Sequence, residues 1–250
     1  MLGGLLFLGY LAIILAFHEL RLTLFISWRR DRRRLAEEFI HIQARRLLRA
    51  ARLLAGLQVE VEPYEALPES FVLVTNHQSL ADIPVLINAF DRQHLKIVAK
   101  HENIRALPSI SKSLRYSRQA SVDRSGPFRA SLLALRQLAQ RLDEGACAVI
   151  FPEGTRSRSG FVGRFHSAGF RVLTGDGKAP VVFAALDGGW RMSGLATLLA
   201  MGRHPYRVKT LKVAPPPRGK AATLALLDQG RALIVEQLSR WREPSGDEID

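Results

Sequence analysis

A histidine and an aspartate five positions apart have the residue types and spacing for proton-transfer chemistry. They lie in Asn76-His-Gln-Ser-Leu-Ala-Asp82, directly after the apolar run 71–75. If that run is a strand and Asp82 falls in the first turn of the next helix, the carboxylate can fold back onto the imidazole of His77. The pair would fix the tautomer of His77 and raise the basicity of its other ring nitrogen. His77 would then be a general base that Asp82 orients.

This pair matches the base and the orienting residue of a Ser-His-Asp triad, but the serine is missing. No Gly-x-Ser-x-Gly segment supplies an elbow serine. The base would therefore act on a hydroxyl group of the substrate. The purely structural alternative is that His77 caps a helix and that Asp82 is a first-turn carboxylate stabilised by the helix dipole.

A second segment has residue types that could bind or activate a substrate. It is Phe151-Pro-Glu-Gly-Thr-Arg-Ser157, which follows an apolar run. Gly154 permits a tight turn and a close approach of the backbone to a ligand. Thr155 and Arg156 offer a hydroxyl and a guanidinium group, both good ligands for phosphate. The structural alternative is a plain connection between a strand and a loop.

Strands and helices alternate around the two motifs. Apolar, β-branched runs predict strands at 71–75, 96–99, 121–123, 146–151, 181–185 and 207–213, and periodic apolar residues predict helices at 79–90, 127–142, 163–174 and 220–241. This order predicts an α/β fold in which a mostly parallel or mixed central sheet is covered by helices. The first motif would then lie at the carboxyl end of a strand, where α/β sheets bind ligands.

The amino terminus predicts an anchor in the membrane. Residues 2–17 carry no charge and no proline, and as a helix they would measure about 24 Å, against about 30 Å for the hydrocarbon core. A cleaved signal peptide would need a basic segment before this run and small residues after it, and neither is present. The arginines within 29–34 favour a cytoplasmic position for residue 29 onward. A re-entrant hairpin, suggested by the charges of Glu19 and Arg21, and a buried core helix are the alternatives.

Residues 33–57 predict a basic amphipathic helix. Apolar residues recur at helical spacing, and four arginines lie on and around the opposite face: Arg45, Arg46, Arg49 and Arg52. Such a helix is typical of an anionic membrane surface. The alternative is a solvated basic face whose leucine stripe packs on the rest of the chain. The sequence thus divides into 1–58, the membrane anchor and amphipathic helix, and 59–250, a globular domain.

Composition narrows the classes of partner. There are 36 lysines and arginines against 23 acidic residues, which gives a net charge of +13. This charge favours an anionic partner: nucleic acid, anionic lipid or a phosphorylated substrate. No nucleic-acid recognition motif is present, and the apolar segment upstream favours lipid. The single Cys147 excludes an intrachain disulfide framework and argues against a zinc-finger cluster, and the histidines show no metal-ligand spacing, so we expect no metal.

The two motifs together resemble those of the glycerolipid acyltransferase family. Asn-His-x-x-x-x-Asp is followed about 70 residues later by Phe-Pro-Glu-Gly-Thr-Arg-Ser, and the branch that this chain is most similar to is the 1-acyl-sn-glycerol-3-phosphate acyltransferases. The resemblance covers roughly residues 70–190. Val122-Asp-Arg124 is similar to a short element of the family, and Lys100 to the basic residue that opens that stretch. The resemblance implies that Arg124, Glu153, Gly154, Thr155 and Arg156 hold the substrate phosphate, and that Lys100 also binds substrate. Because an ionised Glu153 can only accept hydrogen bonds, it would orient an arginine or an acceptor hydroxyl.

The resemblance also implies a reaction. His77 would take the proton from the free hydroxyl of 1-acyl-glycerol-3-phosphate (lysophosphatidic acid), which would attack acyl-CoA or acyl carrier protein and give phosphatidic acid for phospholipid biosynthesis. No cofactor or metal is expected. Residues 59–250 would be the acyltransferase domain. The excess of arginine over lysine suggests a GC-rich bacterial genome. The anchor and its arginine flank predict an enzyme of the bacterial inner membrane, with this domain facing the cytoplasm.

Two departures from the family pattern leave the acceptor open. Phe165-His-Ser-Ala-Gly169 lacks a lysine that the family often has, and a second proline is absent from the strand at Ala179-Pro-Val-Val182. An acyltransferase for another lyso-lipid, such as a lyso-aminolipid, is therefore one alternative. A non-catalytic basic membrane-binding protein on the same scaffold is the other.

Overall fold

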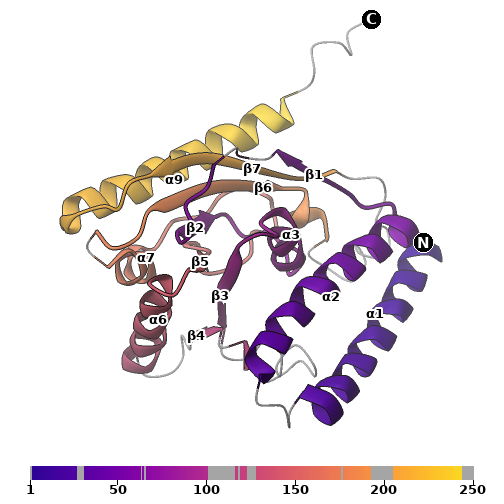
Figure 1. Ribbon diagram of the computed structural model, residues 1–250. Coiled ribbons are helices and arrows are strands. Elements are labelled where there is room, and N and C mark those ends of the chain that lie inside the picture. The colour runs from indigo at the N-terminus through magenta and orange to yellow at the C-terminus, as the bar shows by residue number, and fades with distance from the viewer. Residues whose placement is uncertain are drawn as a thin grey trace, which may run out of the picture.

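The computed structural model has one seven-stranded sheet between two groups of helices (Figure 1). It describes residues 2–26, 31–62, 64, 66–100, 116–117, 119–122, 128–175, 177–192 and 205–243. The strand order is β1-β7-β6-β2-β5-β3-β4. β6 and β7 pair antiparallel, and every other neighbouring pair is parallel. The predicted α/β fold with a mostly parallel or mixed sheet is confirmed.

The elements that the text uses have these bounds. The strands are β1 (Gln58–Glu62), β2 (Val72–Thr75), β3 (His94–Lys100), β4 (Ala120–Val122), β5 (Ala146–Ile150), β6 (Val181–Asp187) and β7 (Pro205–Ala214). The helices are α1 (Leu2–Arg21), the π-helical η1 (Leu22–Ile26), α2 (Arg32–Ala55), α3 (Asp82–Ala89), α6 (Phe128–Leu142), α7 (Ser167–Thr174), the 3-10 turn η2 (Gly189–Met192) and α9 (Gly219–Arg242).

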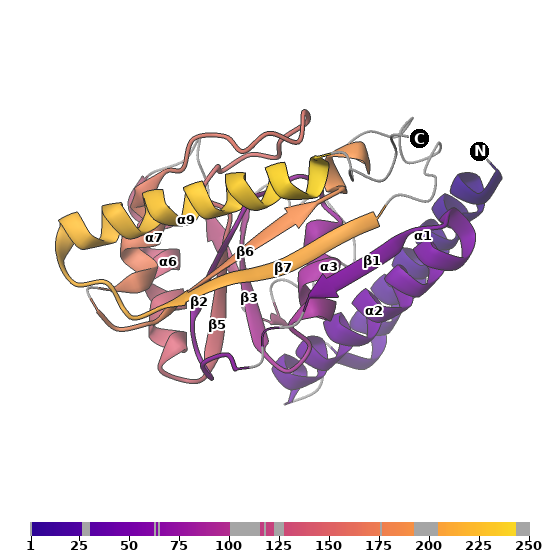
Figure 2. The same cartoon turned by 90° about the horizontal axis from the view of Figure 1, so that it is seen from above.

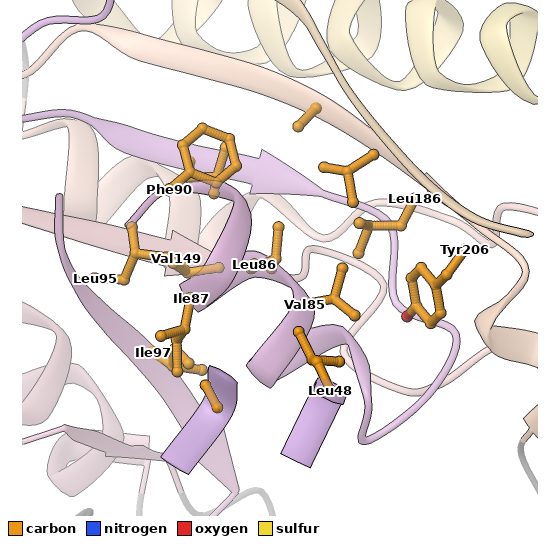
Figure 3. Close-up of a cluster of buried hydrophobic side chains, with 14 of the residues drawn as sticks. Leu48, Val85, Leu86, Ile87, Phe90, Leu95, Ile97, Val149, Leu186 and Tyr206 are labelled. Atoms are coloured by element: carbon orange, nitrogen blue, oxygen red, sulfur yellow. The ribbon is translucent and has the colours of Figure 1, made fainter. Parts of the chain in front are cut away.

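The sheet is buried because its central strands are apolar on both faces. Every residue of β2, β5 and β6 is buried. Leu73 faces the core that α2 and α3 cover, whereas Val72 and Val74 face the core under α6, α7 and α9. Figure 3 shows the first of these cores, where Leu86 of α3 and Phe90, the residue after α3, lie near β3 and β5. Such continuous apolar runs are typical of parallel strands that are covered on both sides.

Two predicted helices begin later than expected, at Asp82 and Ser167 in place of residues 79 and 163. In both places, backbone groups form hydrogen bonds outside a helix. The amide N–H groups of Gln78 and Ser79 donate to the Asp82 carboxylate. Gly163 donates its N–H to Glu153 and accepts a bond from Arg231.

The first two helices lie side by side along one end of the sheet (Figures 1 and 2). α1 exposes large apolar side chains, among them Leu2, Ile13 and Phe17. Leu2–Leu24 is the one helical segment in the described part of the chain that is long and apolar enough to cross a membrane. Arg29 and Arg30, on its predicted basic flank, lie outside the described residues.

α2 confirms the predicted helix at 33–57 and packs on the domain through its apolar face. Ala44, Leu48 and Ala51 are buried in the core shared with α3. The four arginines of its opposite face are exposed: Arg45, Arg46, Arg49 and Arg52. A contact of this face with lipid stays a prediction, as does the division into 1–58 and 59–250.

We expect the Gly230→Ala variant to be less stable than the wild type. Gly230 lies in the middle of α9, and a Cβ atom there would overlap the ring of Phe183, which is fully buried in β6. Alanine favours a helix over glycine by about 1 kcal/mol, but forcing a methyl group into a packed core costs about 1–3 kcal/mol or more. The free energy of unfolding in urea should therefore fall.

Gly219→Ala is not a suitable control for this variant, because Gly219 has a positive φ of 79°. Ala225→Gly, at an exposed position of the same helix, separates the effects of helix propensity and packing. It should lower the stability by about 1 kcal/mol through helix propensity alone. A Gly230→Ala variant as stable as the wild type would contradict the close packing of α9 on β6.

Candidate active site

His77 and Asp82 form the contact that their spacing predicts. Nδ1 of His77 lies 2.6 Å from Oδ2 of Asp82. β2 ends at Thr75, and Asp82 is the first residue of α3, so the turn between the two elements brings the side chains together. The Asp82 side chain is completely buried, whereas 16% of the His77 side chain is exposed. The imidazole thus has one nitrogen against a buried carboxylate and an edge that a substrate can reach.

Backbone amides hold Asp82 in the form that accepts hydrogen bonds. Gln78 donates its N–H to Oδ2 at 2.7 Å, and the N–H of Ser79 lies 3.1 Å from each carboxylate oxygen. Both carboxylate oxygens of Asp82 thus act as hydrogen-bond acceptors. Nδ1 of His77 must then carry the proton in their contact, which leaves Nε2 as the basic nitrogen.

Tyr206 is a member of this site that sequence reasoning missed. Its hydroxyl group donates to Oδ1 of Asp82, and its side chain is fully buried. Burial, followed by the nearby charge of Asp82, raises the pKa of Tyr206 well above its usual value. The hydroxyl group therefore stays a donor. The predicted strand began at Arg207, one residue too late to include it.

Glu153 connects the second motif to the first. Its Oε1 accepts the backbone N–H of His77 at 2.9 Å, and its Oε2 accepts that of Gly163 at 2.8 Å. Glu153 was predicted to orient an arginine or an acceptor hydroxyl; in the structure it holds two backbone amides instead. Burial raises the pKa of Glu153, and the two amide bonds act in the opposite direction. A contact of Glu153 with substrate stays a prediction.

The ring of His77 is fixed from a second side. It stacks on Phe151, with 4.0 Å between ring centroids and 20° between planes. The carbonyl oxygen of His77 accepts the N–H of Ser157 at 2.7 Å. The second motif thus contacts His77 through Phe151, Glu153 and Ser157. These contacts leave the imidazole little freedom to rotate.

The neighbouring residues of the first motif fasten it to β6. The side-chain amide of Asn76 donates to the carbonyl oxygen of Leu186 at 2.8 Å and accepts the N–H of Leu186 at 2.9 Å. Gln78 donates to Asp187 at 3.4 Å. Asp187 in turn pairs with Arg242 of α9. Burial alone would raise the pKa of Asp187, but the hydrogen bonds and charge of Arg242 lower it.

The predicted phosphate residues are only partly placed by the structure. Gly154 has a positive φ of 70°, as expected for a tight turn. Thr155 and Arg156 are exposed, in the loop that Ser157 fastens to His77. Arg124 lies outside the described residues. Lys100 ends β3, but its side chain is not among those described. The contact of all these residues with a phosphate stays a prediction.

Three other features of the described residues could have indicated a site: a hollow, a metal-ligating group and the cysteine. A hollow of about 510 Å³ lies between residues 162–167 and α9, and neither His77 nor Asp82 lines it. Across the described residues, no group of three or more histidine, cysteine or acidic side chains has the arrangement of a metal site. Cys147 is buried in β5, and burial raises the pKa of its thiol to about 11. The pair at the carboxyl end of β2 is therefore the candidate active site.

Known proteins resemble this chain in sequence and in fold. The family model named Acyltransferase matches residues 58–185. A protein of Pseudomonas aeruginosa named 1-acyl-sn-glycerol-3-phosphate acyltransferase is 35% identical over 152 residues, which are 58% of this chain and 56% of that protein. The chloroplastic 1-acyl-sn-glycerol-3-phosphate acyltransferase LPAT1 of Arabidopsis thaliana is 29% identical over 185 residues, which are 72% of this chain and 49% of that protein. The chain thus spans about half the length of the curated relatives it matches.

A solved structure extends the likeness to the whole fold. The 1-acyl-sn-glycerophosphate (LPA) acyltransferase PlsC of Thermotoga maritima aligns with a TM-score of 0.75 and 24% sequence identity. The alignment covers 98% of this chain and 97% of that one. At this level of identity, the match shows a shared fold.

Proposed function

Because the chain belongs to the acyltransferase family, we propose that it transfers a fatty acyl group to the free hydroxyl of 1-acyl-glycerol-3-phosphate. The donor is a thioester, acyl-CoA or acyl carrier protein, and the product is phosphatidic acid for phospholipid biosynthesis. The observation that carries this proposal is the contact of buried Asp82 with the partly exposed imidazole of His77. The names of the relatives support the choice of acceptor.

The reaction needs one proton to move in each of two steps. Nε2 of His77 takes the proton of the acceptor hydroxyl as its oxygen forms a bond to the thioester carbonyl carbon. The carbon–sulfur bond then breaks, and the proton passes from the imidazolium to the leaving thiolate. An ester and a free thiol result, and His77 is neutral again. Asp82 stabilises the transient imidazolium and keeps the proton on Nδ1.

The second motif would serve both positioning and binding. Glu153 holds the backbone of His77. This hydrogen bond would fix the position of Nε2 relative to the acceptor hydroxyl. Gly154, Thr155 and Arg156 would hold the acceptor phosphate, together with Arg124 and Lys100. A guanidinium group binds phosphate oxygens in pairs. No cofactor is needed for this chemistry.

The amino-terminal helices would hold the site at the leaflet that contains the acceptor. The apolar, mostly exposed Leu2–Leu24 fits a membrane span by length and composition. The arginines on the exposed face of α2 match an anionic surface. We propose that the enzyme lies in the bacterial inner membrane. The acyltransferase domain would face the cytoplasm, because arginines follow the apolar span on the side of this domain.

The proposal is tested by transfer of a labelled acyl group in membranes that contain the full chain. Acyl-CoA and acyl carrier protein are supplied separately, each with lysophosphatidic acid, with a lyso-aminolipid and with other lyso-lipids. Labelled phosphatidic acid is the expected product. Transfer only to another lyso-lipid would show that lysophosphatidic acid is not the acceptor, but it would agree with the proposed chemistry. Lipid binding with no transfer to any acceptor would favour the non-catalytic alternative.

We expect the Tyr206→Phe variant to transfer the acyl group about 10-fold to 100-fold more slowly. The variant loses only the hydroxyl group that donates to Asp82, and a hydrogen bond to a charged group contributes about 1.5–3 kcal/mol. Without it, Asp82 is held less firmly against Nδ1 of His77, which accounts for the slower transfer.

Tyr64→Phe is the matched control, because Tyr64 is exposed. It should keep the rate of the wild type. Thermal unfolding of both variants separates a loss of stability from a loss of rate. A Tyr206→Phe variant with the rate of the wild type would show that Tyr206 does not position Asp82.

A further inference from the structure

The loop beside His77 displays an aromatic side chain to solvent. Phe161 is 75% exposed, the largest exposed fraction of any large apolar side chain in the described residues that follow α2. It belongs to the segment 156–164, which we call the rim loop and which links β5 to α7. In Figure 2 the chain between β5 and α7 extends past the sheet beside the carboxyl end of α9. An apolar side chain of this size gains free energy when something covers it.

The rim loop is held in place on both sides of Phe161. Arg242 of α9 donates to the carbonyl oxygen of Gly160 at 3.0 Å. Arg231 of α9 donates to the carbonyl oxygens of Val162 and Gly163 at 3.1 and 2.8 Å. Gly160 has a φ of +81°, and a Cβ atom there would lie 2.9 Å from the ring of Trp190. The exposure of Phe161 is therefore a fixed feature of the fold.

The charge of the rim loop matches an anionic surface. Arg156, Arg158 and Arg164 are all exposed. No acidic residue occurs in the sequence between Glu153 and Asp176. An aromatic side chain among arginines is typical of segments that lie in the headgroup region of a membrane. Basic residues near an anionic leaflet strengthen binding through electrostatic attraction to the lipid phosphates.

The rim loop also contacts the candidate active site directly. Gly163 donates to Glu153, which accepts the N–H of His77. Ser157, near the other end of the loop, donates to the carbonyl oxygen of His77. Leu80, in the first motif itself, is 47% exposed. A surface that binds the rim loop would thus lie at the entrance to His77.

We propose that the rim loop is a second membrane contact, in which Phe161 inserts into an anionic leaflet while Arg158 and Arg164 bind lipid phosphates. The contact rests on the proposed function in one respect, since the same leaflet holds the acceptor. It would bring the hydroxyl of an embedded lyso-lipid to Nε2 of His77 without the lipid leaving the bilayer. An acidic carrier protein would also attract the arginines. However, attraction between charges does not explain the exposed aromatic side chain of Phe161, whereas insertion into a leaflet does.

The test places a fluorescent probe at the loop in the full chain. The Phe161→Cys variant is labelled at neutral pH with a polarity-sensitive dye. Cys147 stays unlabelled, because it is buried and its pKa is about 11. The matched control is Leu133→Cys on α6, where the native side chain is 57% exposed. The proteins are reconstituted in vesicles of phosphatidylglycerol with phosphatidylethanolamine, or of phosphatidylcholine alone.

The emission of the dye at position 161 should shift to the blue in the anionic vesicles, and spin-labelled lipids should quench it. The dye at position 133 should show neither effect. Equal spectra at the two positions would overturn the contact, and an equal shift in phosphatidylcholine would overturn the role of the arginines. A shift on addition of acyl carrier protein to detergent-solubilised enzyme, with none in vesicles, would assign the loop to the donor.

A kinetic measurement separates the contact from the chemistry. The Phe161→Asp variant should transfer acyl groups to lyso-lipid in vesicles at least about 10-fold more slowly, and to a water-soluble short-chain acceptor at the rate of the wild type. Equal losses with both acceptors would contradict a membrane role. If the wild type transfers to no acceptor, the proposed function fails, but the fluorescence result still decides the contact.

Discussion

The His77→Ala variant is expected to lose acyl transfer by a factor of about 10²–10⁴, the usual contribution of a general base. Of the two ring nitrogens of His77, Nε2 is the one that can accept a proton from a substrate, because Nδ1 contacts Asp82 at 2.6 Å. Removal of the ring leaves the acceptor hydroxyl with no base.

The measurement is transfer of labelled acyl groups in membranes with matched amounts of each protein. His94→Ala is the control, because His94 is exposed at the first residue of β3, at the opposite end of the strand from the carboxyl edge. It should keep the rate of the wild type. The proposed mechanism is wrong if His77→Ala transfers as fast as His94→Ala.

The central strands of the fold could be predicted because burial on both faces leaves a continuous apolar run. β2, β5 and β6 are such strands, and each was predicted within two residues of its observed ends. β1 was missed, since it reads Gln-Val-Glu-Val-Glu and lies at the edge of the sheet with no residue buried. Its pairing with β7 joins residues about 150 positions apart, and no local pattern encodes that.

The site shows the same division between local and distant contacts. The pair of His77 and Asp82 was predictable because both residues belong to one turn between a strand and a helix. Glu153 reaches His77 across 76 residues, and Tyr206 reaches Asp82 across 124. These partners depend on which strands are neighbours, which the sequence pattern alone does not show. Glu153 could be singled out as a motif residue, but its partners could not.

The Asp82→Asn variant should lose up to about 10⁴-fold in rate, the size of the effect that the same change has in Ser-His-Asp enzymes, and no more than His77→Ala loses. An asparagine keeps only one of the two carboxylate oxygens: Oδ1 of Asp82 accepts hydrogen bonds from Ser79 and Tyr206, whereas Oδ2 contacts His77 and accepts one from Gln78. If the asparagine oxygen takes the place of Oδ1, its NH₂ group faces Nδ1 of His77. Nδ1 must then accept a hydrogen bond, so the proton moves to Nε2. The nitrogen that should act as the base is then already protonated.

Asp91→Asn, at an exposed position just after α3, is the matched control and should leave the rate unchanged. Thermal unfolding shows how far the lost hydrogen bonds lower the stability of Asp82→Asn. The double variant with His77→Ala gives the sharper result. Because Asp82 acts only through His77, the double variant should transfer no more slowly than His77→Ala alone. A further loss of rate in the folded double variant would mean that Asp82 acts on the substrate by another route.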